Sequence, residues 1–218
     1  MRKKYKAILF DFDGTLVPSL DYWFAGFRHA FDQLGRPVTD QEILSGCFYK
    51  DDTAISAAFG LECTRTFWDL VQTKIKSCYD TAALFPGVVD VLDDCAAKGI
   101  PMALVTSSER PVIHKAFSCL PLQKYFDVVV TASDVTNLKP HPEPILTALD
   151  GLGLGATGAR ETLFVGDYLV DVLAGKAAGC DVGLFHNDSH ERYHQREHLQ
   201  NSEADFVFSD FRELASRY

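Results

Sequence analysis

The chain has 218 residues, 47% of them hydrophobic, so it can bury one sizeable core or a core domain with a small accessory one. Its formal net charge is −9 and its pI is near 5.2, an acidic balance that disfavours nucleic acid and anionic membranes as partners. An anionic small substrate would need a local positive site, which a cation and a few lysines can supply.

The beginning of the chain and its cysteines indicate a cytoplasmic protein. Basic residues at 2–6 resemble the start of a signal peptide, but the apolar run 7–10 stops at Asp11, far short of the roughly 7–15 residues required. No stretch approaches the ~20 apolar residues of a membrane span. Six scattered cysteines without a C-x-x-C pair favour reduced thiols. They are Cys47, Cys63, Cys78, Cys95, Cys119 and Cys180.

The first part of the chain predicts one strand and then a helical block. Residues 5–10 are typical of a short buried strand, followed by a turn at 13–15. Apolar residues repeat at helical spacing from Leu20 to Leu34, and a capping-box pattern at 39–42 predicts a second helix. Two more helices are expected, at 54–59 and 67–78. The aromatic stripes are best interpreted as the core of a small helical bundle.

After residue 87 helices and strands alternate. We expect helices at 88–98, from 109, at 142–149 and at 170–178, and strands at 100–105, 127–130, 162–165, 181–185 and 206–208. This alternation predicts an α/β fold with a doubly wound parallel sheet. The helical block is then an insertion after the first strand. The expected domains are 1–17 with 86–218, which form the α/β core, and 18–85, which form a helical domain.

Chemically active side chains follow several of the predicted strands. In open α/β sheets, ligands bind at the carboxyl ends of the strands. Four aspartates, one lysine and a cluster of hydroxyl groups converge on that edge. They lie in Asp11-Phe12-Asp13-Gly14-Thr15, Thr106-Ser107-Ser108, Leu138-Lys139-Pro140 and Gly166-Asp167-Tyr168-Leu169-Val170-Asp171.

This set of residues indicates phosphoryl transfer assisted by Mg²⁺. Asp11 and Asp13 are two residues apart in an extended segment, so they face one site. Crowded carboxylates repel one another unless a cation lies among them, and oxygen ligands suit Mg²⁺. One carboxylate can attack phosphorus while another acts as general acid and base. Hydroxyl and backbone N–H groups balance the charge of the phosphoryl group, so we assign substrate binding to Gly14, Thr15 and Ser107.

These four motifs, in this order, resemble those of the haloacid-dehalogenase-like superfamily over residues 7–180. The helical block lies where the phosphoglycolate-phosphatase-like and β-phosphoglucomutase-like branch carries a helical cap. The resemblance implies the following roles: Asp11 as nucleophile and metal ligand, Asp13 as general acid/base that lends its backbone carbonyl to the metal, Thr106 as phosphoryl-binding residue, Lys139 as charge-neutralising residue, Asp167 as metal ligand, and Asp171 as a ligand directly or through water. An acid at Asp13 favours phosphate-ester chemistry, because the dehalogenases of the superfamily lack it.

The resemblance also indicates where specificity arises. Caps of this branch lower a loop onto the substrate, so Tyr49 and Lys50, in the loop 46–52, are candidate specificity residues, with a solvated turn as the alternative. Two residues depart from the usual pattern. Tyr168 stands where a small Ser or Thr is common, and Pro18 where many relatives have Asp. Both leave the substrate class open.

Three further patterns carry weaker signals. Residues 153–158 match G-x-G-x-x-G but follow a predicted helix and precede a strand, so we interpret them as a loop. His141 lies beside Lys139-Pro140, and a plain loop role is favoured. Four histidines recur every fourth residue, and on a helix neighbouring pairs could hold a transition metal. A polar surface segment is the favoured interpretation, and the alternative is a segment that borders the active-site mouth, because the series follows a strand's carboxyl end: His186, His190, His194 and His198.

We therefore expect a Mg²⁺-dependent phosphatase that acts on a small phosphorylated metabolite. A phosphomutase of the β-phosphoglucomutase type is the alternative, because both chemistries use Asp11 and Asp13 alike. A non-catalytic protein on this fold is a third class, disfavoured because every reacting residue is present. No interface is evident, so we expect a monomer, with a dimer as the alternative.

Overall fold

The computed structural model describes residues 4–194, 199 and 202–218. The chain divides into two compact units, one made of Met1–Pro18 with Ala83–Tyr218 and the other of Ser19–Ala82. Among the described residues, no helix is both long and apolar enough to cross a bilayer.

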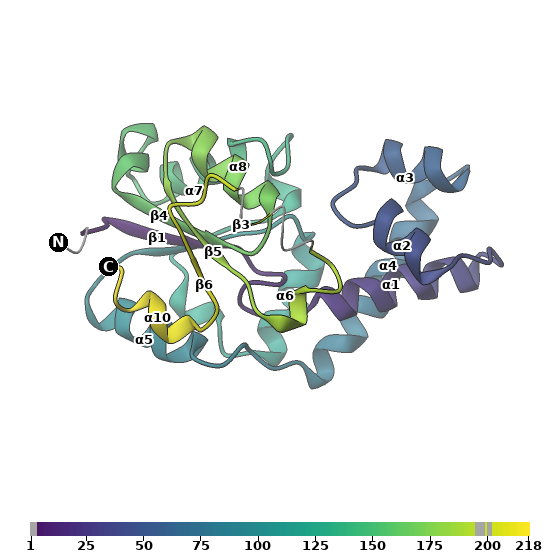
Figure 1. Ribbon diagram of the computed structural model, residues 1–218, viewed down its shortest axis with the longest axis horizontal. Helices are drawn as coiled ribbons and strands as arrows, with labels where there is room; N and C mark the ends of the chain where they lie inside the picture. Colours follow the sequence, from purple (N-terminus) through teal and green to yellow (C-terminus); the bar gives the residue numbers. More distant parts are fainter. Residues whose placement is uncertain (1–3, 195–198, 200–201) are drawn as a thin grey trace. The chain divides into compact units, whose positions relative to one another are not determined.

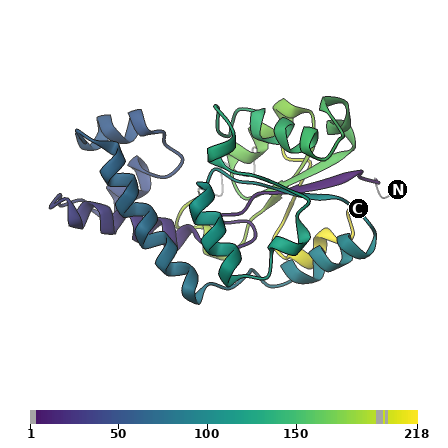
Figure 2. The same ribbon diagram turned by 180° about the vertical axis from the view of Figure 1, so that it is seen from behind.

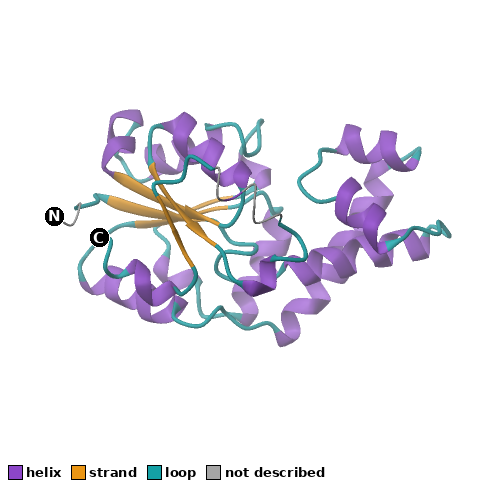
Figure 3. Ribbon diagram, in the orientation of Figure 1, coloured by secondary structure: helices purple, strands orange, loops and turns teal. Residues whose placement is uncertain are grey.

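The first unit contains one six-stranded sheet in which all neighbouring strands are parallel, in the order β3-β2-β1-β4-β5-β6. The strands lie between two layers of helices (Figure 3). Their bounds are β1 Ala7–Phe10, β2 Met102–Val105, β3 Val128–Val130, β4 Thr162–Gly166, β5 Asp181–Phe185 and β6 Phe206–Phe208. The predicted parallel, doubly wound α/β fold is confirmed. The first two strands begin two residues later than predicted.

Helices cover both faces of this sheet, with α7 and α8 on one and α5 and α10 on the other (Figure 1). Their bounds are α5 Val88–Ala97, α6 Arg110–Cys119, α7 Glu143–Gly151, α8 Leu169–Ala178 and α10 Phe211–Leu214. Short 3₁₀ helices occur at η2 Gln123–Tyr125, η3 Ala132–Asp134, η4 Ala156–Glu161 and η5 Asp188–His190. The pattern at 153–158 lies between α7 and β4, but only its first half is a loop, because 156–158 begin the 3₁₀ helix η4. The short helix α10 was not predicted.

The sequence of the strands explains this layering. The central strands are continuous apolar runs, such as 7–10 in β1, because a parallel sheet covered on both faces buries every side chain. Alternation sends Ala7 and Leu9 to the face with α7, where they join Ile145 and Leu149 in one buried cluster. Phe10 packs from β1 against Phe126. The sheet is therefore a rigid support for the loops at its carboxyl ends.

The second unit is helical, with bounds α1 Leu20–Gln33, α2 Asp40–Gly46, α3 Asp52–Phe59, α4 Thr64–Cys78 and η1 Tyr79–Thr81. Helices α1 and α4 pack against each other and cross in both views (Figures 1 and 2). Phe27 and Phe31 of α1 contact Phe67 of α4, so the aromatic stripes form the core of this unit as predicted. The predicted capping box is present, because Thr39 and Glu42 bond each other's backbone N–H groups.

Candidate active site

The nucleophile candidate Asp11 directly follows β1 and opens a tight turn. The N–H of Gly14 donates to the carbonyl of Val17 over 2.9 Å, which closes the turn. Gly14 has a φ of +78°, and a Cβ placed there would lie 2.3 Å from Oδ2 of Asp167. Only glycine suits this position, because both the backbone conformation and the close approach of the carboxylate exclude a side chain. The turn thus brings the end of β1 against the end of β4.

Lys139 joins two carboxylates that come from different strand ends. Its Nζ lies 2.5 Å from Oδ1 of Asp11 and 2.7 Å from Oδ1 of Asp171. The lysine side chain is 3% exposed, so both ion pairs are shielded from water. Its peptide bond to Pro140 is cis. The predicted convergence of Asp11, Lys139 and Asp171 is therefore present in the structure.

Three carboxylates form an oxygen cluster beside this lysine. Asp11, Asp167 and Asp171 are buried, and one oxygen from each lies within 4.8 Å of the others. Oδ2 of Asp171 accepts hydrogen bonds from the N–H groups of Asp167, at 3.2 Å, and Tyr168, at 3.1 Å. The hydroxyl of Thr15 lies 3.4 Å from both Asp11 and Asp167. The site therefore gathers three carboxylates beside the ammonium group of Lys139, which pairs with two of them, Asp11 and Asp171.

The electrostatics of the cluster fit a bound metal ion. Burial raises the pKa of Asp11 to about 7, with Lys139 opposing and Asp171 adding to the rise. Burial and the neighbouring carboxylates raise the pKa of Asp167 well above its usual value. Burial alone would lower the pKa of Lys139, but Asp11 and Asp171 raise it. Oδ2 of Asp167 is buried and has no hydrogen-bond partner among the described residues. A hard divalent cation with oxygen ligands would relieve this excess of buried negative charge.

Asp13 is held by Ser108, which is not among the residues predicted for the site. Its Oδ2 accepts a hydrogen bond of 2.6 Å from the hydroxyl of Ser108. Ser108 is buried, and its N–H donates to Oγ1 of Thr106, whereas Ser107 is exposed. The sequence contains a sign of this role, because Ser108 lies two residues beyond Thr106. The same spacing places the side chains of Asp11 and Asp13 on one side of an extended segment. The binding role predicted for Ser107 stays a prediction.

The histidine series is not a polar surface segment, and this interpretation was wrong. His186, His190 and His194 are buried, at 6%, 1% and 2% exposure. They follow β5 through η5 and a turn rather than along one face of a helix. Burial lowers the pKa of His190 to about 4 and that of His194 to about 2, so both rings are neutral near pH 7. His198 lies outside the described residues.

Two of these histidines reach the residues of the candidate active site. Nε2 of His190 lies 2.8 Å from the carbonyl oxygen of Gly14, and Nε2 of His194 lies 3.4 Å from Oδ2 of Asp167. The ring of Tyr168 stacks on His194 with the ring centroids 4.3 Å apart. Tyr168, the departure noted above, thus packs on a histidine that contacts the oxygen cluster. The composition of this polar segment gave no sign of its burial.

The remaining candidates lie apart from the oxygen cluster or in the other unit. The side chain of His141 is 54% exposed, and its Nδ1 accepts a hydrogen bond from the N–H of Glu143, which is a local loop contact. Tyr49 and Lys50 belong to the helical unit, between α2 and α3, and both are exposed. Tyr49 has a φ of +58°, a conformation uncommon outside glycine. Pro18 is the last residue of the first segment of the α/β unit.

The first unit is thus a parallel α/β core that gathers aspartates and a lysine at the carboxyl ends of its strands. Residues 8–185 match the model of the haloacid dehalogenase-like hydrolase family, and the chain belongs to that family. It is 30% identical to a phosphoglycolate phosphatase of Shigella boydii, with 96% of this chain and 90% of the relative covered. It is 32% identical to the phosphoglycolate phosphatase of Yersinia pestis, with 97% of this chain and 92% of the relative covered.

Solved structures share the fold. CbbY from Rhodobacter sphaeroides in complex with phosphate is 22% identical, covers 96% of both chains and has a TM-score of 0.81. A subfamily IA hydrolase of the haloacid dehalogenase superfamily from Geobacter sulfurreducens is 24% identical, covers 97% of this chain and 95% of its own, and has a TM-score of 0.68. The family model and the two phosphoglycolate phosphatase relatives confirm the expected superfamily and the expected class of enzyme, a phosphoric monoester hydrolase.

Proposed function

We propose that the chain hydrolyses the phosphate ester of a small metabolite through an aspartyl-phosphate at Asp11. The observation that carries this proposal is the environment of Asp11. Its carboxylate is buried, is paired with Lys139 at 2.5 Å and lies in the cluster with Asp167 and Asp171. A carboxylate placed beside a fixed positive charge can approach an anionic phosphoryl group, because the lysine offsets the repulsion between them.

The reaction has two displacements at phosphorus. In the first, a carboxylate oxygen of Asp11 attacks phosphorus while the bond to the ester oxygen breaks, and Asp13 gives its proton to the leaving alcohol. In the second, Asp13 takes a proton from water, the water oxygen attacks phosphorus, and the bond to Asp11 breaks. Inorganic phosphate and the free carboxylate result. The hydrogen bond from Ser108 holds Asp13 in one position for both steps.

Mg²⁺ is the proposed cofactor. Asp11, Asp167 and Asp171, together with the backbone carbonyl of Asp13, would hold it, and the bound cation would neutralise charge on the phosphoryl group. Lys139 would add a second positive charge from the protein, and the hydroxyls of Thr106 and Thr15 would bind phosphoryl oxygens. Gly14, whose N–H is bonded to Val17, would contribute by closing the turn that carries Asp11 and Asp13. Ser107 is a further candidate for this binding.

The substrate is proposed to be a small phosphorylated metabolite, with phosphoglycolate as the first candidate. The relatives from Shigella boydii and Yersinia pestis are phosphoglycolate phosphatases, and one CbbY structure holds xylulose-(1,5)-bisphosphate. We propose that the helical unit, Ser19–Ala82, is the cap and that Tyr49 and Lys50 contribute to specificity. We also propose that the enzyme works in the cytoplasm as a monomer.

A test of the reaction uses an aryl phosphate as a generic substrate. We expect phosphate release that needs Mg²⁺ and is lost in Asp11→Asn, because an amide cannot act as the nucleophile. Asp32→Asn, an exposed residue of α1, is the matched control and should retain activity. Wild-type turnover by folded Asp11→Asn would exclude the assigned nucleophile.

A panel of phosphorylated metabolites tests the substrate class. Values of kcat/KM for phosphoglycolate, sugar phosphates, nucleoside monophosphates and pyrophosphate should rank phosphoglycolate first. Isomerisation of β-glucose 1-phosphate that is stimulated by a sugar bisphosphate would instead identify a phosphomutase.

A further inference from the structure

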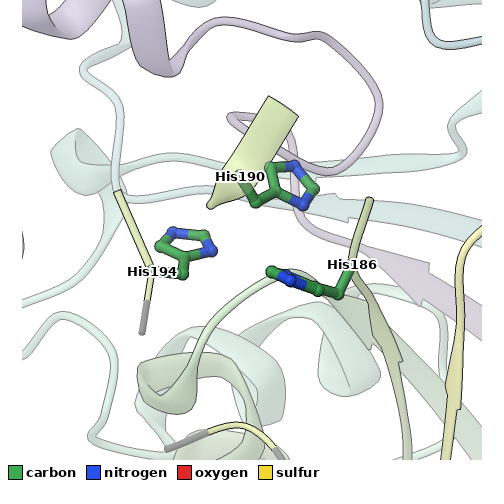
Figure 4. A group of neighbouring side chains, drawn as sticks. All are labelled: His186, His190 and His194. Atoms are coloured by element: carbon green, nitrogen blue, oxygen red, sulfur yellow. The ribbon is translucent and has the colours of Figure 1, made fainter. Parts of the chain in front are cut away.

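Three histidine rings surround a common space beside the oxygen cluster (Figure 4). His186 directly follows β5, His190 ends η5, and His194 lies in the turn beyond it. The ring centroids are separated by 5.5 Å for His186 and His190, 5.3 Å for His190 and His194, and 6.3 Å for His186 and His194. One nitrogen from each ring lies within 4.8 Å of the others. The reaction proposed above uses none of these rings.

We propose that His186, His190 and His194 form a second metal site, one that binds a transition-metal ion such as Zn²⁺. Imidazole nitrogens suit Zn²⁺, Cu²⁺ and Ni²⁺, whereas carboxylate oxygens suit Mg²⁺. The chain thus presents two adjacent donor sets of different chemistry, an all-nitrogen set after β5 and an all-oxygen set after β1 and β4.

The spacing of the nitrogens is close to what a tetrahedral ion requires. Zn–N bonds of about 2.0–2.1 Å place neighbouring nitrogens about 3.4 Å apart. The nitrogens here lie no more than 4.8 Å apart, so the rings must close by at most about 1.4 Å. Small rotations of the imidazoles supply a movement of that size. Three protein nitrogens leave one position of the tetrahedron for water or another ligand.

The outer nitrogen of one ring already has the partner that a metal-bound histidine usually has, and that of a second ring lies near a carboxylate. A histidine that binds metal through one nitrogen commonly donates its other N–H to a backbone carbonyl or a carboxylate. Nε2 of His190 faces the carbonyl of Gly14 at 2.8 Å, and Nε2 of His194 faces Oδ2 of Asp167 at 3.4 Å. The bond to Gly14 leaves Nδ1 of His190 for the metal.

Binding through Nδ1 of His190 requires one exchange. In the metal-free protein that nitrogen accepts a hydrogen bond from the N–H of Asn187 over 3.1 Å. The ion would replace this N–H as the partner of Nδ1, while the bond from Nε2 to Gly14 remains. Gly14 and Asp167 both belong to the candidate active site. The second metal would therefore lie one histidine away from that site, through His190 to Gly14 and through His194 to the neighbourhood of Asp167.

X-ray absorption at the zinc edge tests the site directly. Tag-free full-length protein is stripped with a chelator, supplied with one equivalent of Zn²⁺, and kept in excess Mg²⁺ to occupy the oxygen cluster. We expect one bound ion with three imidazole nitrogens at about 2.0–2.1 Å. Failure to bind Zn²⁺, or an oxygen-only coordination sphere, would overturn the proposal.

Variants locate the ion independently of catalysis. His186→Gln and His194→Gln should each weaken Zn²⁺ binding by about 100-fold or more, whereas the exposed His141→Gln should bind as wild type does. Asp11→Asn should also retain the site, so a failure of the phosphatase proposal is distinguishable from a failure of this one. Zn²⁺ affinity that falls in Asp11→Asn but not in the histidine variants would place the ion in the oxygen cluster and reject the second site. Circular dichroism of the metal-free variants checks folding. If a variant does not fold, the X-ray absorption spectrum of the wild-type protein alone decides the test.

Discussion

The ammonium group of Lys139 lies 2.5 Å from Oδ1 of Asp11, although 128 residues separate the two in the chain. The pair forms because Asp11 follows β1 while Lys139 lies in the loop between β3 and α7, and the parallel sheet brings these segments to one edge. The same ammonium also bonds Asp171. One lysine therefore balances two buried carboxylates.

Removing this lysine should destabilise the metal-free protein. Lys139→Met leaves carboxylates buried without their partner, and such a loss costs about 3–5 kcal/mol. The matched control is Lys98→Met, which breaks an exposed pair with Asp94 and should cost under about 1 kcal/mol. Urea unfolding in a chelator measures both. Equal losses for the two variants would show that the Lys139 pairs do not balance the cluster.

The contribution of Asp11 to the stability of the metal-free protein should fall as the pH rises through the range in which this residue titrates. The pKa of Asp11 is raised to about 7, whereas an unfolded aspartate has a pKa near 3.9. Between about pH 4 and 7 Asp11 thus binds more protons in the folded state than in the unfolded state, so its titration favours unfolding as pH increases, whereas the buried His190 and His194 act in the opposite direction. Unfolding titrations of wild type and Asp11→Asn in a chelator should differ in slope over this range. Parallel curves would contradict the prediction.

The hydrogen bond from Ser108 to Asp13 should matter for turnover. Ser108→Ala removes a charge-assisted bond, worth about 1.5–3 kcal/mol, that holds the proposed general acid/base, so kcat should fall about tenfold or more. Ser107→Ala changes the exposed neighbouring hydroxyl and is the matched comparison, with a smaller effect on kcat expected. A larger loss of kcat in Ser107→Ala than in Ser108→Ala would reverse this assignment.

Gly14→Ala should disable the site through a steric effect. The new Cβ would lie 2.3 Å from Oδ2 of Asp167, so the turn or the carboxylate must move, and a displacement of about 1 Å can cost about 100-fold in rate. Gly35→Ala separates this clash from backbone strain, because Gly35 also has positive φ but nothing lies within 4 Å of its added Cβ. Its activity should stay near that of wild type. Steady-state kinetics with Mg²⁺ compare the two variants.

Much of the fold and of the candidate site could be predicted from local sequence. Strand–helix alternation predicts a parallel sheet, and the carboxyl ends of its strands bring Asp11, Lys139 and Asp171 together, as found. The strand and helix ends differ from the prediction by up to three residues, because hydrogen bonding between elements decides where pairing begins.

The burial of the histidine series could not be predicted from local sequence. Its polar composition resembles a solvated loop, but His190 contacts Gly14 across 176 residues of sequence, and His194 lies beside Asp167. Such contacts depend on the tertiary fold and leave no periodic signal in the segment itself.

The central claim, a covalent phosphoryl group on Asp11, is tested most directly by trapping it. The Asp13→Asn variant is mixed with Mg²⁺ and an excess of ³²P-labelled aryl phosphate, which can still react because an aryl leaving group needs little protonation. The reaction is quenched in acid within milliseconds, and the digested protein is mapped. We expect up to one acid-stable, base-labile phosphoryl group per chain, on the peptide that contains Asp11. Label on another residue, or full turnover with no labelled protein at any quench time, would contradict the proposed mechanism.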